Sequence, residues 1–191
     1  MMNQKKVCKL FFLTTALLLL FSIVAYAAYP IRIAIIPPVD RAKYGEPELN
    51  QLVLTQLKDN FTNSKYDLAL DSQIDSALND ITQGQKLTTL PEKQMLKRMS
   101  DALSADIVIA VEFTRLSSVI LPSLYSSNEM RNISITSAVY VAKNDSYKTF
   151  NSRRNETSES DGFRGIRRLT KECVDEFTRN LNKYLNNSNI L

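Results

Sequence analysis

The most constraining feature of the sequence is the apolar run at residues 105–111, which reads Ala-Asp-Ile-Val-Ile-Ala-Val. Successive side chains of a strand point to opposite faces of its sheet, and this run is apolar on both faces. A strand of that kind needs cover on both sides, and helices packed on either face of an open sheet provide it. The run therefore predicts the central strand of an α/β domain.

Apolar periodicity elsewhere in the chain switches between the strand period and the helical period. Strands are expected at residues 31–36, 66–70, 105–111, 132–142 and 147–151. Helices are expected after Pro47, after the capping-box pattern at residues 72–75, after Pro91, and near the C-terminus. The predicted fold is a single α/β domain with the order β-α-β-α-α-β-β-β-α. Early strands separated by helices should pair in parallel, whereas the late strands should form an antiparallel meander, which gives a mixed sheet with packed helices.

The last predicted helix has the clearest amphipathic pattern. Its apolar stripe consists of Ile166, Leu169, Cys173, Val174, Phe177, Leu181, Tyr184 and Leu185. Cys173 is therefore expected to be an inert core thiol rather than a reactive one. The domain is expected to span residues 28–186, with an Asn-rich end at residues 187–191 that frays.

Residues 1–27 have the pattern of a secretory signal peptide. Lys5, Lys6 and Lys9 form a basic start, an apolar stretch follows from residue 10, and Ala-Tyr-Ala closes the segment at residue 27. An alternative is an uncleaved inner-membrane anchor at residues 10–28, which is long enough to span a bilayer. The chain would then contact a membrane through this segment only.

Charge and composition exclude several function classes. Of the 24 Lys and Arg residues, three lie in residues 1–27, which carry no acid, so the mature chain has 21 bases against 20 acids and a net charge of +1. A nucleic-acid partner is therefore not supported. The Gly-Phe-Arg-Gly sequence at residues 162–165 is similar to a KH loop, but here it only opens a helix. The sequence contains no His, which excludes Ser-His and Cys-His nucleophile pairs and His-ligated zinc.

Several segments resemble a loose group of bacterial envelope domains. The likeness rests on residues 31–38, 52–61, 66–70, 105–111 and 139–143. The group includes the N-terminal domain of the periplasmic Tol–Pal component, the curli-export lipoprotein, and the lipoprotein activators of peptidoglycan synthases. The resemblance implies a non-enzymatic binding or assembly module. This chain lacks the lipid-anchoring cysteine that several of those proteins carry.

The segment that follows the predicted central strand is apolar where a connection is expected to be polar. We expect residues 116–125 to form a loop that either caps an open sheet edge or presents an apolar patch to a partner. The candidate partner surface consists of Val119, Ile120, Leu121, Leu124 and Tyr125.

A second candidate site lies where two parallel strands are expected to end. Asp40 follows the first strand, Glu112 ends the central one, and Arg115 is a nearby cation. Ligands commonly bind in the crevice beyond the carboxyl ends of adjacent parallel strands. Pro37 and Pro38 stand where a phosphate-binding loop would place glycines, so a nucleotide cofactor is not indicated. No other pattern in the sequence indicates a cofactor, a metal site or catalytic residues.

These observations predict an exported, non-enzymatic protein of the periplasm or cell envelope that docks an unknown envelope protein through an edge strand and an apolar loop. The alternative is a periplasmic protein that binds a small ligand or glycan, less plausibly a weak hydrolase, in the crevice near Asp40 and Glu112.

Overall fold

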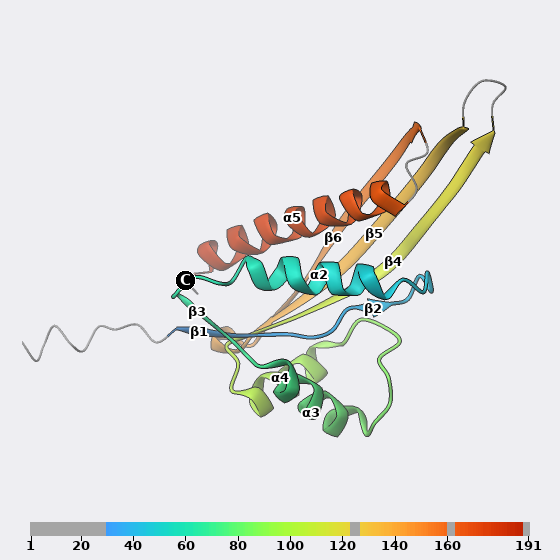
Figure 1. The fold of residues 1–191 in the computed structure, drawn as a ribbon. Helices are drawn as coiled ribbons and strands as arrows, with labels where there is room; N and C mark the ends of the chain where they lie inside the picture. The colour runs from blue at the N-terminus through green and yellow to red at the C-terminus, as the bar shows by residue number, and fades with distance from the viewer. Residues whose placement is uncertain (1–29, 123–126, 160–162, 189–191) are drawn as a thin grey trace, which may run out of the picture. The chain divides into compact units, whose positions relative to one another are not determined.

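The computed structural model describes residues 30–122, 127–159 and 163–188 (Figure 1). The expected signal peptide at residues 1–27 and two residues of the candidate partner surface, Leu124 and Tyr125, lie outside the described residues.

One mixed sheet organises the domain. Its strands are β1 (Ile31–Ile35), β2 (Val39–Asp40), β3 (Tyr66–Leu68), β4 (Ile107–Pro122), β5 (Ser127–Val141) and β6 (Ser146–Glu159). The spatial order is β3-β1-β4-β5-β6, and the short strand β2 also pairs with β4. The pairs of β1 with β3 and β4 are parallel, and β4, β5 and β6 form an antiparallel meander. The predicted fold class and element order are confirmed, with β2 as an addition.

Helices cover both faces of the sheet, as the apolar central strand requires (Figure 1). The helices are α2 (Pro47–Asp59), α3 (Asp71–Thr82), α4 (Lys93–Leu103) and α5 (Phe163–Asn187). On one face, Ile107, Ile109 and Val111 of β4 form a core with α2 and α5. On the other face, Val108 and Ala110 form a second core with α3 and α4. Alternation along a single strand therefore supplies both cores.

Helix α5 buries the stripe that its sequence predicts. Seven of the eight stripe residues are buried, and Tyr184 is partly buried beside them. Burial raises the pKa of the Cys173 thiol to about 11, so it stays protonated at neutral pH.

An ionic contact joins α4 to the turn between β5 and β6. This turn contains the 3₁₀ helix η2 (Ala142–Asn144), and Asp145 follows it. The Asp145 carboxylate binds Lys93 Nζ at 2.8 Å and accepts a hydrogen bond of 2.9 Å from the Tyr140 hydroxyl. The hydrogen bonds from Lys93 and then Tyr140 lower the pKa of Asp145 to about 2. Burial, together with Asp145, raises the pKa of Tyr140 to about 12.

The last three strands are longer than the sequence predicts. Residues 116–122 continue β4 instead of forming a loop, and the polar residues 152–159 continue β6. The correction has a physical reason: pairing with residues 127–135 of β5 satisfies the backbone groups that each segment turns toward β5, whatever the polarity of the side chains. We call residues 115–122, 127–134 and 153–159 the arm.

A buried arginine of the arm, Arg131, contacts α5. The Arg131 side chain is fully buried on β5, with Nη2 at 2.5 Å from the Glu129 carboxylate and Nη1 at 2.9 Å from Ser158 Oγ. Glu156 of β6 lies near Arg131 and also accepts a hydrogen bond from Arg168 of α5, which lowers the pKa of Glu156 despite the opposing effect of burial. The ion pair between Glu156 and Arg168 thus holds α5 against the arm, beyond the end of the apolar core.

The substitution Gly165→Ala tests this contact. Gly165 lies in α5 under the Arg131 guanidinium, and an added Cβ would lie 2.5 Å from its Cζ. Helix propensity alone predicts a gain of about 1 kcal/mol for glycine to alanine inside a helix. We expect instead a loss of about 1–3 kcal/mol in the free energy of unfolding, because the buried guanidinium must move. Chemical denaturation measures it. Asn182→Ala, at an exposed position of the same helix, is the control, and a more stable G165A protein would contradict the contact.

Candidate interaction surface

In the part of the chain that the structure describes, no helix packs on one face of the arm. Figure 1 shows α5 running along the other face of β4, β5 and β6, while α3 and α4 lie near the opposite end of these strands. The bare face consists largely of short polar side chains, for example Asn132 on β5 and Asn155 on β6, which pair in register. The arm is therefore a three-stranded sheet with only one covered face.

Apolar side chains are exposed near the end of the arm. The exposed fractions are 45% for Val119, 61% for Ile120 and 41% for Leu121. Met130 of β5, opposite Val119 in the register, is 37% exposed. Alternation places Val119, Leu121 and Met130 on the bare face and Ile120 on the face that α5 partly covers. Exposed large apolar side chains gathered at one place indicate an interaction surface.

The outer edge of β4 is open along the arm. β1 pairs with β4 as far as Ile109, and β2 pairs with it as far as Phe113. Beyond Phe113, no strand within the described ranges pairs with this side of β4. The segment is therefore neither a loop nor a cap over another edge. It is itself an edge strand, with backbone donors and acceptors available to a further strand.

The two edges of the arm differ in charge. From Leu116 to Pro122 the edge strand β4 carries no charged residue. The other edge, β6, carries Arg153, Arg154, Glu156 and Glu159. Charged side chains on an edge strand oppose the addition of another strand, so β4 is the edge that a partner strand would join.

The second candidate site is not assembled as one crevice. Asp40 pairs with Phe113 and Val39 pairs with Glu112, so the Asp40 and Glu112 side chains point to opposite faces of the sheet. Glu112 lies in the middle of β4, not at its end as the sequence suggested, because the strand continues to Pro122.

Each of these carboxylates has a local partner. Asp40 accepts hydrogen bonds from the backbone N–H groups of Tyr44, at 3.3 Å, and Gly45, at 2.9 Å. Glu112 is buried, accepts a hydrogen bond of 3.0 Å from the backbone N–H of Leu90, and has Arg41 at 3.9 Å. Arg115 is exposed further along β4. Both acids therefore hold neighbouring loops to the sheet.

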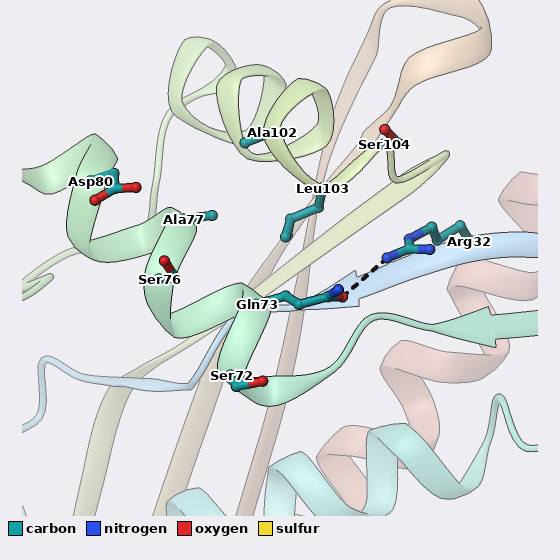
Figure 2. A pocket seen from close by; sticks show the side chains of 9 residues that line it. All are labelled: Arg32, Ser72, Gln73, Ser76, Ala77, Asp80, Ala102, Leu103 and Ser104. Carbon is teal, nitrogen blue, oxygen red and sulfur yellow. Dashed lines mark hydrogen bonds between the residues drawn. The ribbon is translucent and has the colours of Figure 1, made fainter.

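An open polar hollow of about 580 Å³ lies between α3 and the end of α4 (Figure 2). Arg32 of β1 reaches into it and donates to Gln73 Oε1 at 3.1 Å, and the Arg32 guanidinium also lies 3.4 Å from Asp67. Gln73 Oε1 accepts a second hydrogen bond, from the backbone N–H of Leu70 at the start of α3. These contacts connect β1, β3 and α3, so Gln73 Oε1 and the two Nη atoms of Arg32 have structural partners.

Comparisons with known proteins identify a likeness of fold. No protein-family model matches the sequence, and no curated protein matches it either. The lipoprotein GNA1162 from Neisseria meningitidis matches with a TM-score of 0.50 at 11% identity, over 78% of this chain and 99% of that chain.

Two further structures match at lower scores. The hypothetical protein CT253 from Chlamydia trachomatis has a TM-score of 0.46 at 14% identity, over 78% of this chain and 96% of that one. LpoB from E. coli has a TM-score of 0.44 at 9% identity, over 69% of this chain and 59% of that one. The likeness to GNA1162 shows a shared fold, so the resemblance to bacterial envelope domains is confirmed at the level of the fold. Within the described ranges, no helix has the length and apolar character needed to cross a membrane.

Sequence reasoning missed two members of the arm, Met130 and Arg131. Both lie in the alternating sequence of residues 129–135, where Glu129, Arg131, Ile133 and Ile135 share one face. That alternation was the available signal: a residue two positions from a buried Ile lies on the same face of the strand.

Exposure along β4 predicts two different stability effects. Leu116 is buried in the core, so Leu116→Ala is expected to lower the free energy of unfolding by about 2–3 kcal/mol. Leu121 is exposed, so Leu121→Ala is expected to change it by less than about 0.5 kcal/mol. Urea denaturation of both variants makes the comparison. A large loss for Leu121→Ala would show that the arm residues belong to the core.

Proposed function

We propose that this chain is an exported, non-enzymatic protein of the bacterial cell envelope that binds another envelope protein through the arm. Binding occurs by strand addition: an extended, apolar segment of the partner pairs with the open edge of β4. Val119, Ile120 and Leu121 contact the side chains of that segment. Leu124 and Tyr125, which follow them in sequence, belong to the same proposed surface.

The observation that carries the proposal is an edge of β4 that no described strand covers and that has no charge from Leu116 to Pro122, beside exposed apolar side chains. Backbone hydrogen bonds at a sheet edge bind any extended segment, and the flanking side chains select among segments. The edge has no charged residue between Leu116 and Pro122, so it favours an apolar segment over a charged one.

Export is supported by the basic start, apolar stretch and Ala-Tyr-Ala sequence of residues 1–27. The fold shared with a bacterial lipoprotein is consistent with that destination.

Charges placed on the edge of β4 are expected to weaken partner binding. Val119→Lys with Leu121→Lys should weaken binding of the partner by about tenfold or more, because the incoming apolar strand would meet two cations. The matched control is Asn155→Lys with Thr157→Lys, which adds the same charge to the same face at the β6 edge. All four positions are exposed, so every variant should keep the wild-type melting temperature.

Affinity purification from envelope fractions, followed by a titration with the recovered partner, measures the effect. Equal loss of binding in both double variants would show that added charge, rather than the β4 edge, decides the result. Unchanged binding in the β4 variant would contradict strand addition.

Export is expected to remove the first 27 residues. The intact mass of the protein recovered from the periplasmic fraction should correspond to a chain that begins at Ala28. A full-length chain in the membrane fraction would instead indicate the anchored form, and a full-length chain retained in the cytosol would contradict the proposal.

A further inference from the structure

The start of α5 carries an unusual concentration of positive charge. Its first nine residues, 163–171, contain Arg164, Arg167, Arg168 and Lys171 and no acidic residue. Arg168 is held by Glu156 of β6 and, at 2.9 Å, by Glu172 of α5. The other three cations follow the spacing i, i+3, i+7, which places them on one face of the helix. We call Arg164, Arg167 and Lys171 the cationic stripe.

Local electrostatics work against this arrangement. The N-terminal end of a helix is its positive end and is stabilised by acidic side chains, whereas cations are favoured at the other end. Cations three and four residues apart also repel one another along the helix. The core does not require them, because α5 packs through its apolar stripe on the other face, for example Ile166 and Leu169. Departures from local rules of this kind are expected at functional sites.

Few acidic side chains of the described residues neutralise the positive charge of the cationic stripe. Arg167 lies 3.8 Å from Glu48 of α2, and both side chains are more than half exposed, so this ion pair is weak. In the part of the chain that the structure describes, neither Arg164 nor Lys171 has an ion pair or a side-chain hydrogen bond. The stripe borders a surface hollow of about 500 Å³, which Phe163 and Arg168 complete.

We infer that the cationic stripe binds the anionic surface of a phospholipid membrane. Seven residues of helix place Arg164 and Lys171 about 10 Å apart along the axis, so the three cations contact several headgroups at once. Within the described residues no neighbouring group fixes Arg164 or Lys171, which suits the diffuse charge of a lipid surface better than the fixed acids of a protein partner. Phe163 packs against the core, so the contact is electrostatic and peripheral.

This binding is separate from strand addition at the arm, since it uses α5 and no residue of β4. It would bring an exported chain to the membrane surface through α5. Because the stripe is exposed, added salt should weaken the contact steeply.

Vesicle co-sedimentation tests the inference. The protein is the chain from Ala28 onward, which contains the compact unit of residues 31–191 and excludes the apolar N-terminal segment. The probes are vesicles of phosphatidylglycerol mixed with phosphatidylcholine, and vesicles of phosphatidylcholine alone. Binding is expected to the anionic vesicles only. Arg164→Gln with Lys171→Gln should lower the partition coefficient by about tenfold or more.

The matched control is Arg179→Gln with Lys183→Gln, which removes two exposed cations further along the same helix. At about 0.1 M salt its binding should stay within about twofold of wild type, because charges more than about 10 Å from the contact are then screened. Three results would overturn the inference: no binding to anionic vesicles at low salt, equal losses in the two double variants, or binding to polyglutamate that exceeds binding to vesicles. The last result would assign the stripe to an acidic protein.

Discussion

The structure depends on β4, a single strand of 16 residues that lies in two different environments. Its first half is covered by helices on both faces and contributes to both cores. Its second half has helix α5 on one side only and an open edge. Because β5 pairs with β4 along its length and β6 pairs in turn with β5, both extend with β4, and the arm exists as a consequence of that pairing. Glu156 of β6, which lies near the buried Arg131 and forms an ion pair with Arg168 of α5, then provides an ionic contact between the arm and α5.

The sequence predicts the covered half of the domain well and the arm poorly, for a physical reason. A strand that is buried on both faces appears in the sequence as an unbroken apolar run, as at residues 105–111. The buried face of α5 appears as apolar residues at the helical period. Residues 152–159 are polar and have no such period, and their strand conformation comes from pairing with a distant segment. Asp40 and Glu112 illustrate the same limit. They are close in the sheet, but their pairing register sends the two side chains to opposite faces, and no local pattern reveals a register between distant strands.

The two proposed surfaces lie on different elements and would bind different partners. The arm offers backbone groups and apolar side chains, which suit one extended protein segment. The cationic stripe of α5 offers charge without fixed geometry, which suits a membrane surface. Neither surface needs a reacting group, and the Cys173 thiol is buried with its pKa raised. Asp40 and Glu112, the two acids that suggested a ligand crevice, have structural partners instead, as has Arg32 Nη2 in the hollow beside α3.

Amide hydrogen exchange along the arm is the most direct test of strand addition. In the free protein, outward-facing amides of residues 117–121 on β4 should exchange rapidly, since no described strand covers them. When the partner is bound, the account predicts that these amides become protected while those on the outer edge of β6 keep their rates. Protection that appears only on β6 or on the helices, with β4 unchanged, would contradict it.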